Sequence, residues 1–332
     1  MKKILLVRFS SIGDIVLTTP IIRCLKEQQP ENELHYLTKT AFKDLLCDNP
    51  HLSKLHTIER SIQEITATLK TEAYTCIIDL HHNLRTKRLS LSLNIPMYSF
   101  PKLNIRKWLF VHFKWDNMPS IHIVERYFEA CGPLNIQNDG KPGELFIDAK
   151  HIVQIRSWFN NTDPIIGIAI GAQFATKRLP KHKLSKLIGE LNANIVLIGG
   201  KTDAELGEEL CSENTDKRII NACGKYSLQE SISIVSQLDT LVTHDTGMMH
   251  VAACFNVPIV SVWGNTTPKL GMYPYRGNQP VNYSIHEVQG LSCKPCSKIG
   301  FQRCPKKHFN CMEQQDVNGI AQEANRFAKP TN

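Results

Sequence analysis

Short apolar runs with strand character alternate with amphipathic helical patterns along the whole chain, in two successive series. The first series contains the runs KILLV, ELHYL and TCIIDL, with helical patterns around residues 15–27, 61–70 and 123–130. The second contains IIGIAIGA, IVLIGG, KRIIN, TLVTH and PIVSVWG, with helical segments such as residues 227–236. This alternation is typical of parallel sheets with crossover helices. The sequence therefore predicts an α/β protein of two tandem, doubly wound Rossmann-like domains.

The segment ELFIDAKHIVQIRSWFNNTDP separates the two series. We interpret it as a strand, an amphipathic helix and a polar break, and place the junction near residues 150–163. The predicted domains are residues 1–155 and residues 156–332, the second ending in a helix that Asp316 caps. Two such domains are expected to enclose a ligand cleft between them at the carboxyl ends of their sheets.

Composition leaves several classes of partner open. With 332 residues and 42% hydrophobic content, the chain can bury a sizeable core. Its start, MKKILLVRFSSIGD, has too short an apolar run for a signal peptide or a membrane helix, so we expect a cytoplasmic protein. A formal charge of +8 favours an anionic partner, which leaves nucleic acid, a membrane surface or a phosphorylated substrate.

The first motif, SSIGDIVLTTP, follows the first strand. Gly13 would allow a tight turn, and a helix would open near Asp14 or Ile15. Asp14 would then lie at the carboxyl end of the sheet, either as a reactive carboxylate or simply as a helix N-cap. Pro20 is unfavourable inside a helix, so the helix is expected to start late or to bend there.

Two further motifs suit a bound diphosphate. In GAQFATKRLPKHK, Thr176 offers a hydroxyl and Lys177 a positive charge just beyond a strand; a solvated basic loop is the alternative. In HDTGMMH, the backbone N–H groups of Thr246, Gly247 and Met248 would open a helix, where an anion is favoured. Asp245 and Thr246 could instead only cap that helix, and His250 could be a buried histidine. Neither first strand is followed by Gly-x-Gly-x-x-Gly, which argues against a dinucleotide cofactor.

The order of these motifs resembles the ADP-heptose:lipopolysaccharide heptosyltransferases, glycosyltransferase family nine. The resemblance extends from residue 3 to about residue 312, and RFSSIGDIVLTTP and DTGMMHVAA are its most specific parts. It implies a GT-B fold, with an N-terminal acceptor domain and a C-terminal ADP-sugar domain. It also implies transfer of heptose from ADP-heptose to the lipopolysaccharide inner core, at the inner face of the cytoplasmic membrane.

The resemblance also implies roles for individual residues. Asp14 would be the catalytic base, near acceptor contacts at Ser10, Ser11 and Gly13. The donor site would consist of Thr176, Lys177, Asp203, Asp245, Thr246, Gly247, Met248 and His250. Two positions depart from the family pattern: Leu179 stands where the family often has Trp, and Asp203 is shorter than the Glu sometimes found there.

These residue types suit an inverting transfer. A base would deprotonate the acceptor hydroxyl, while Lys177 and a helix N-terminus would neutralise the departing diphosphate without a cation. No Asp-x-Asp motif occurs in the cleft segments, so no cofactor is expected for catalysis. Arg85 and Arg88, and the mixed basic and aromatic segment KLNIRKWLFVHFKW, suit an anionic glycolipid at a membrane surface. The alternative for the latter is an amphipathic helix with its aromatic side in the core.

Four of the eleven cysteines gather in CKPCSKIGFQRCPKKHFNC: Cys293, Cys296, Cys304 and Cys311. Their number suits a structural zinc site, with His308 as a substitute ligand, although the second pair has an unusual spacing. A reduced or paired structural cluster is the alternative.

Two other functions remain open. A sugar-nucleotide 2-epimerase would share the architecture but would need no glycolipid surface. A nucleic-acid-binding protein could use the +8 charge, but the basic residues do not form one stripe and no nucleic-acid module is present, so no nucleic-acid partner is expected.

Overall fold

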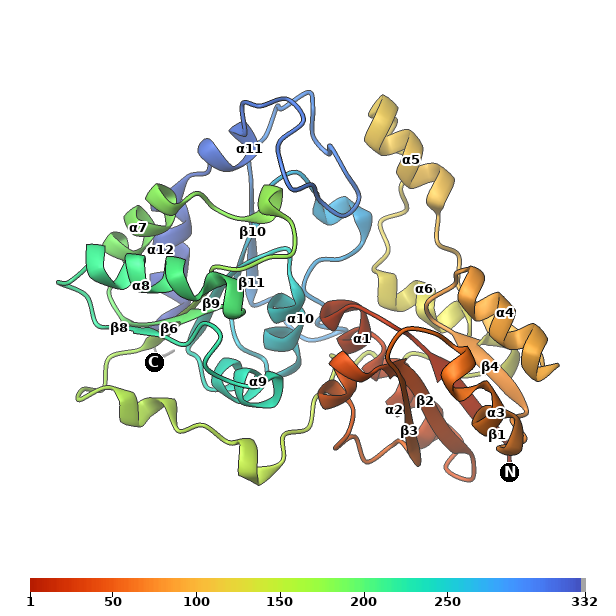
Figure 1. The fold of residues 1–332 in the computed structure, drawn as a ribbon. Coiled ribbons are helices and arrows are strands. Elements are labelled where there is room, and N and C mark those ends of the chain that lie inside the picture. The colour runs from red at the N-terminus through yellow and green to blue at the C-terminus, as the bar shows by residue number, and fades with distance from the viewer. Residues whose placement is uncertain (330–332) are drawn as a thin grey trace. The chain divides into compact units, whose positions relative to one another are not determined.

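The computed structural model describes residues 1–329 and contains two parallel β-sheets, each in its own compact unit (Figure 1). The first unit comprises Met1–Leu103, Ile121–Phe146 and Tyr275–Gln279. The second comprises Asn104–Ser120, Ile147–Pro274 and the chain from Pro280 onward. The predicted α/β class with two doubly wound parallel sheets is confirmed.

The first sheet has the strand order β3-β2-β1-β4-β5, and all its pairs are parallel. Its strands are β1 (Lys3–Val7), β2 (Glu33–Lys39), β3 (Lys54–Ile58), β4 (Cys76–Asp79) and β5 (Met97–Ser99). The order runs outward from β1 to β3 on one side and from β4 to β5 on the other. The topological switch point therefore lies between β1 and β4, where ligands bind in folds of this kind.

The helices of the first unit follow the crossover pattern that the sequence predicts. They are α1 (Ile12–Val16), α2 (Thr19–Gln28), α3 (Gln63–Thr71), α4 (Leu84–Leu93) and α6 (Ile123–Glu129). Short 3-10 turns cover Thr40–Leu45 and Gly132–Leu134. A core of Leu5, Val7, Leu37 and Ile77 with α3 and α4 residues such as Leu69 and Leu89 fills one side of the sheet.

The second sheet has the order β11-β10-β9-β6-β7-β8, again entirely parallel. Its strands are β6 (Ile165–Ala169), β7 (Asn194–Ile198), β8 (Ile219–Asn221), β9 (Thr240–His244), β10 (Ile259–Trp263) and β11 (Tyr283–Glu287). Here the switch point lies between β6 and β9. Both central strands are fully buried, as expected for a parallel sheet covered on both faces.

The helices of the second unit are α5 (Asn104–Phe113), α7 (Lys181–Glu190), α8 (Ala204–Glu213), α9 (Leu228–Ser236), α10 (Gly247–Cys254), α11 (Asn310–Glu313) and α12 (Val317–Ala328). The predicted cap of the last helix is confirmed, since the Asp316 side chain accepts a hydrogen bond from the Gly319 N–H. Helix α12 lies beside α7 and packs on the second sheet, where Ile320 and Ala324 are buried in its core (Figure 1). None of the described helices is long and apolar enough to span a membrane.

The contiguous division into residues 1–155 and 156–332 differs from the structure in three places. The main crossing lies at Phe146–Ile147, because the segment after it already bonds to the second unit: Ser233 Oγ accepts from the Val153 N–H at 3.0 Å. This segment forms 3-10 turns at Ala149–His151 and Ile155–Trp158 instead of the predicted strand and helix.

The other two differences are short excursions of the chain. Helix α5 belongs to the second unit, since Lys114 after it donates to the carbonyls of Cys293 and Pro295 at 3.1 and 2.7 Å. Tyr275–Gln279 belongs to the first unit, where the Tyr275 hydroxyl donates to Glu125 at 3.0 Å. Contacts between residues far apart in the sequence cause both excursions, so local patterns did not predict them.

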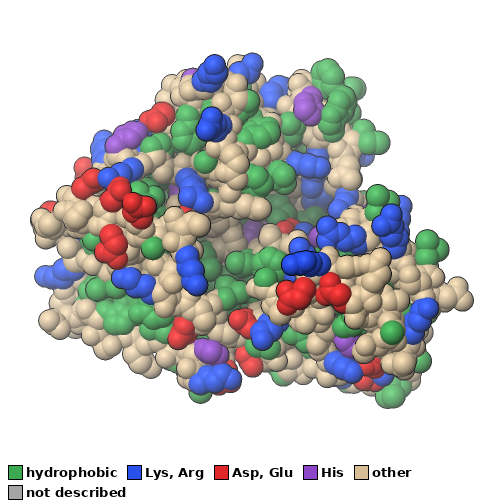
Figure 2. Space-filling view, viewed as in Figure 1, with side chains coloured by type: hydrophobic (Ala, Val, Ile, Leu, Met, Phe, Trp, Pro, Cys, Tyr) green, Lys and Arg blue, Asp and Glu red, His purple; other side chains and the backbone are tan. Residues whose placement is uncertain are grey.

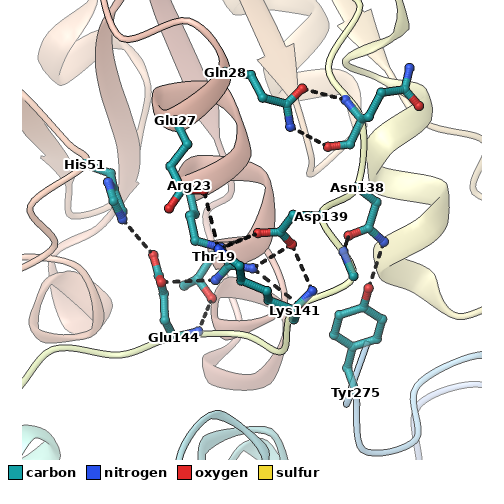
Figure 3. A network of polar contacts seen from close by, with 12 residues as sticks. Thr19, Arg23, Glu27, Gln28, His51, Asn138, Asp139, Lys141, Glu144 and Tyr275 are labelled. Carbon is teal, nitrogen blue, oxygen red and sulfur yellow. Dashed lines mark hydrogen bonds and ion pairs between the residues drawn. The ribbon is translucent and has the colours of Figure 1, made fainter. Parts of the chain in front are cut away.

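A polar network secures the last part of the first unit (Figure 3). Arg23 on α2 donates to both oxygens of Asp139, at 2.8 and 3.1 Å, and to Glu144 at 3.0 Å. Glu144 also lies 3.1 Å from His51 Nε2, and its N–H donates to Thr19 at 2.9 Å. The network therefore fixes residues 138–144 against α2.

Candidate functional site

Asp14 lies at the carboxyl end of β1, beside the switch point of the first sheet. It occupies the third position of α1, whose N-cap is Ser11, so the alternative that Asp14 serves as the N-cap is wrong. The Ser11 N–H and hydroxyl both donate to Asp14 Oδ2, at 3.1 and 2.8 Å. The helix starts earlier than predicted, with Ser11 as its N-cap, because the Asp14 carboxylate at the third helical position accepts the Ser11 N–H, the contact that this residue makes in a capping box.

Gly13 consequently lies inside α1, buried, and does not form the expected turn. The turn precedes it at Ser10, whose carbonyl accepts from Arg8 Nε at 2.8 Å. Pro20 lies in the first turn of a second helix, α2, which a turn at residues 17–18 separates from α1, so the helical segment breaks just before Pro20 rather than starting late.

The strongest partner of Asp14 is Arg8, the first residue after β1. Arg8 Nη2 lies 2.5 Å from Asp14 Oδ1, and Arg8 Nη1 donates to the Leu80 carbonyl after β4 at 2.5 Å. Burial alone would raise the pKa of Asp14, but the Arg8 charge and the Ser11 hydrogen bonds outweigh it and hold the pKa below its ordinary value. Asp14 is therefore an ionised carboxylate at neutral pH, with its side chain 23% exposed. Sequence reasoning missed Arg8, although its position directly after the strand was a signal.

The loop after β4 lies beside β1 in the first sheet. Asp79 Oδ1 accepts from the N–H groups of His81 and His82, at 3.0 and 2.7 Å, and thereby shapes the loop into α4. Asn83 caps α4, which presents Arg85 and Arg88 to solvent. Both arginines are exposed, and a contact of either with the acceptor stays a prediction.

On the second sheet, Lys177 and Asp245 meet at the switch point, after β6 and β9. Lys177 Nζ lies 2.6 Å from Asp245 Oδ2 and donates to the Asp245 carbonyl at 3.0 Å. Thr266, after β10, donates to the same carboxylate oxygen at 2.8 Å. Three neighbouring strands therefore place a cation, a carboxylate and a hydroxyl together.

Helix α10 begins at the same point. Thr246 is its N-cap but makes no capping bond with its side chain, which lies 3.2 Å from the Thr243 hydroxyl. Thr246, Gly247 and Met248 are all partly exposed, and the amides of a first helical turn have no intrahelical acceptors. His250 is buried one turn later. The predicted helix start is thus present in the fold, and anion binding there stays a prediction.

The side chains of Thr176 and Asp203 are both hydrogen-bonded within the protein. The Thr176 hydroxyl is buried, donates to the Phe301 carbonyl at 2.9 Å and accepts from its N–H at 2.8 Å. Asp203 is also buried, with one oxygen on Arg178 at 3.0 Å and the other on the Gly200 N–H at 2.8 Å. Their expected contacts with diphosphate and ribose stay predictions, and in this structure both side chains hold loops in place.

Burial lowers the pKa of His244 to about 3, and the charges of Arg178 and Lys177 add to this effect. The neutral ring accepts the Leu179 N–H through Nε2 at 2.9 Å. His244 therefore joins the end of β9 to the loop that carries Lys177.

Asn265, which sequence reasoning missed, lies just after β10 and is 1% exposed. Neither its side-chain oxygen nor its nitrogen has a hydrogen-bond partner among residues 1–329. An unpaired buried amide costs about 1–3 kcal/mol, so such a group is expected where a water or a ligand completes its bonding. Its place in GNTTP after a predicted strand was the available signal.

The cysteine cluster does not form a convergent metal centre. Cys293 Sγ lies 3.8 Å from His308 Nε2, but the Cys296 thiol donates to the Cys293 carbonyl at 2.9 Å. Cys293, Cys296, Cys304 and Cys311 are free thiols. No three of these ligand atoms lie within 4.8 Å of one another; among residues 1–329 only His35, His56 and Glu72 form such a group. Zinc at the cysteines stays a prediction without support from this geometry.

The sequence model of Glycosyltransferase family 9 (heptosyltransferase) matches residues 62–301. Lipooligosaccharide heptosyltransferase 2 of Haemophilus ducreyi is 25% identical over 296 residues, which cover 80% of this chain and 84% of the relative. Lipopolysaccharide heptosyltransferase 2 of Escherichia coli K12 is 23% identical over 293 residues, with the same coverage.

Solved structures agree with this fold. A family 9 glycosyl transferase from Veillonella parvula has a TM-score of 0.78 at 21% identity, covering 98% of this chain and 97% of its own. The E. coli ADP-heptose lps heptosyltransferase II has a TM-score of 0.72 at 20% identity, covering 98% of both chains. The family match covers most of the chain and includes both the Lys177 loop and the start of α10. The chain therefore belongs to glycosyltransferase family 9, the heptosyltransferase family, and is a glycosyltransferase.

Proposed function

We propose that the chain transfers heptose from ADP-heptose to the inner core of lipopolysaccharide, by a single inverting displacement that needs no catalytic metal. Membership of the heptosyltransferase family supports heptose as the transferred sugar. The names of the relatives, lipooligosaccharide and lipopolysaccharide heptosyltransferases, support the acceptor. An E. coli heptosyltransferase of the same fold has been solved with ADP, with a TM-score of 0.69 and 18% identity over 98% of this chain and 100% of its own.

The observation that carries the proposal is the convergence of Lys177 and the start of α10 at the switch point of the second sheet. A diphosphate there would meet one ammonium group and the free amides of Thr246, Gly247 and Met248. Asp245 and Thr266 hold Lys177 in place, so little reorganisation is needed when charge builds on the departing ADP. Asn265 is a further candidate to contact the donor.

The second component is the carboxylate of Asp14. We propose that it takes the proton of the acceptor hydroxyl while that oxygen bonds to the anomeric carbon and the bond to the ADP oxygen breaks. One such displacement inverts the anomeric configuration. The low pKa of Asp14 keeps it ionised and ready to accept a proton, and Arg8 would stabilise the carboxylate before the step.

An anionic glycolipid acceptor would suit the exposed arginines of α4 and the exposed aromatic side chains of α5. Arg85 and Arg88 extend from α4 into solvent. In and after α5, Ile105, Trp108, Phe113 and Trp115 are between 52% and 76% exposed, which contradicts a wholly core-facing aromatic side. Figure 2 shows hydrophobic side chains at the surface over the position of α5. We propose that this patch contacts the inner face of the cytoplasmic membrane, as a peripheral association.

Donor specificity is tested by thermal unfolding with ADP, ADP-heptose, UDP and UDP-glucose. We expect ADP and ADP-heptose to raise Tm selectively. Lys177→Met should abolish most of that shift, because the diphosphate loses its ammonium contact. Lys181→Met is the matched control, since Lys181 pairs with Glu209 and Glu213 on the surface and should leave the shift intact. Equal stabilisation by UDP ligands, or none by any nucleotide, would contradict the proposed donor.

Membrane association is tested by flotation with vesicles of anionic and of neutral lipid. We expect binding to anionic vesicles, weakened by the double variant Trp108→Ser and Phe113→Ser. The control is the double variant Ile152→Ser and Val281→Ser. It removes two apolar side chains elsewhere in the same unit that are 50% and 68% exposed. Equal loss in both double variants, or no binding by the wild type, would refute the membrane contact.

A further inference from the structure

A second polar cluster lies in the first unit, toward the amino-terminal ends of its strands and thus at the opposite end of the sheet from Asp14. His35 on β2 and His56 on β3 are 1% and 4% exposed. Glu72, at the end of α3, and Tyr74, just before β4, complete the cluster. The proposed transfer reaction gives these four side chains no role.

Their ligand atoms converge on one point. His35 Nδ1 lies 3.3 Å from His56 Nε2 and 3.9 Å from Glu72 Oε2, and all three atoms lie within 4.8 Å of one another. Ligand atoms bound to zinc at 2.0–2.1 Å in a tetrahedron are separated by roughly 3.3 Å. Small side-chain movements would therefore bring this group to the geometry of a bound ion.

The hydrogen bonding of His35 also favours metal binding. His35 Nε2 lies 2.9 Å from Glu33 Oε1, a carboxylate that only accepts, so this nitrogen carries the hydrogen of the neutral ring. The lone pair then resides on Nδ1, which faces His56. Metal-bound histidines are usually oriented in this way, with the second ring nitrogen donating to a carboxylate.

Tyr74 holds the two ring nitrogens together in the absence of an ion. Its hydroxyl lies 2.7 Å from His35 Nδ1 and 2.9 Å from His56 Nε2. One hydroxyl hydrogen can serve only one of two lone pairs, so His56 must supply a hydrogen from Nε2 to close the network. In the other tautomer of His56 both nitrogens present lone pairs, which is the state that an ion requires.

The charges around Glu72 allow this exchange. Lys3 and Lys54 pair with Glu72 at 3.0 and 2.5 Å and neutralise it without an ion. Lys3 also lies 3.4 Å from Glu33 Oε2, so it keeps a partner if Glu72 turns toward the histidines.

We propose that His35, His56 and Glu72 form a binding site for a divalent transition-metal ion, for which their imidazole and carboxylate ligands favour Zn²⁺. Three protein ligands leave a fourth position for water beside the Tyr74 hydroxyl. The ion would join β2, β3 and the segment between α3 and β4, and so stabilise the sheet without taking part in the transfer reaction.

The test uses full-length protein without an affinity tag, stripped of metal by a chelator and titrated with Zn²⁺. We expect one ion per chain and a higher Tm. His56→Gln and Glu72→Gln should weaken binding at least 100-fold, and Glu33→Gln, a positioning change, by about 10- to 100-fold. His51→Gln is the matched control in the same unit, because His51 also faces a carboxylate but outside this cluster. Circular dichroism checks that each variant is folded.

Co²⁺ bound to the wild-type protein gives a second readout that needs no variant. Visible bands without thiolate-to-cobalt charge transfer in the near ultraviolet would support nitrogen and oxygen ligands. Strong thiolate-to-cobalt charge transfer would assign the ion to the cysteines and overturn the proposal. The same conclusion would follow if the double variant Cys293→Ser with His308→Gln lost the ion while His56→Gln kept it. Failure of the folded wild-type protein to take up Zn²⁺ would do the same, whatever its transferase activity.

Discussion

The first unit contains two arginine–aspartate pairs that are chemically alike and differ in what they connect. Arg8 and Asp14 are six residues apart and lie at the carboxyl end of β1. Arg23 and Asp139 are separated by 116 residues, and Glu144 adds a second carboxylate to that arginine (Figure 3). A pair between residues far apart in the sequence helps to offset the entropy cost of closing a long loop, and it holds a distant segment against the rest of the unit. A pair between near neighbours fixes little chain, so its position at the switch point points to chemistry.

The largest difference between the pairs is expected in catalysis. Asp14→Asn should lower kcat by about 10²- to 10⁴-fold, because the amide can still accept from Ser11 but cannot take a proton from the acceptor. Asp139→Asn also removes one carboxylate from a buried arginine. Its kcat should stay within about threefold of the wild-type value, because Asp139 takes no proton in the reaction. Steady-state kinetics and unfolding are measured on both proteins. A stable Asp14→Asn variant with wild-type turnover would remove Asp14 from the mechanism.

The next effect concerns stability and should be found at the other pair. Arg23→Met leaves the carboxylates of Asp139 and Glu144 without their cation and should cost about 3 kcal/mol of unfolding free energy. These carboxylates retain 16% and 23% exposure and can rehydrate in part, which places the cost at the lower end of the range for buried pairs. Urea unfolding measures it. Unchanged stability would show that the network in Figure 3 does not secure residues 138–144.

The smallest effect is a pH dependence that both pairs share. For Asp139, as for Asp14, burial alone would raise the pKa. The arginine charge and the local hydrogen-bond donors lower it by more than burial raises it, so the pKa in the folded state is depressed. Such a group stabilises the fold above its unfolded pKa of about 3.9, and this contribution is lost as the pH falls through the folded value.

The stability difference between wild type and Asp139→Asn should therefore be constant from pH 7 to about 5 and shrink below about 4. Denaturation series at several pH values measure this difference. A difference that grows on acidification would reverse the sign and contradict the depressed pKa of Asp139.

The sequence predicted those parts of the fold that local patterns determine. Buried apolar runs such as KILLV and TLVTH became central strands, and the cap at Asp316 was correct. The strands β3, β5 and β11 were missed, because they lie at or near sheet edges and have few buried residues. The excursions of α5 and of Tyr275–Gln279 depend on contacts between distant residues, which periodicity cannot reveal.

The candidate site divides in the same way. Asp14, Lys177 and the start of α10 were predictable because each lies in the segment that follows a buried strand of a parallel sheet. The contacts of the site residues were not predicted. Arg8, the partner of Asp14, was overlooked. The contacts of Asp203 with Arg178 and of Thr176 with Phe301 depend on the tertiary fold. Asn265 shows the same limit, since only the structure reveals that its buried amide is unpaired.

Heptosyl transfer itself is tested most directly by incubating the protein with ADP-heptose and lipopolysaccharide that lacks its inner-core heptose, and analysing both products. We predict one heptose added per ADP released, with inverted anomeric configuration and with full activity in the presence of EDTA at a temperature where the protein stays folded. The same reaction without acceptor should leave ADP-heptose unchanged. Conversion of ADP-heptose into another sugar nucleotide without acceptor, or retention of configuration in the product, would contradict the proposed function.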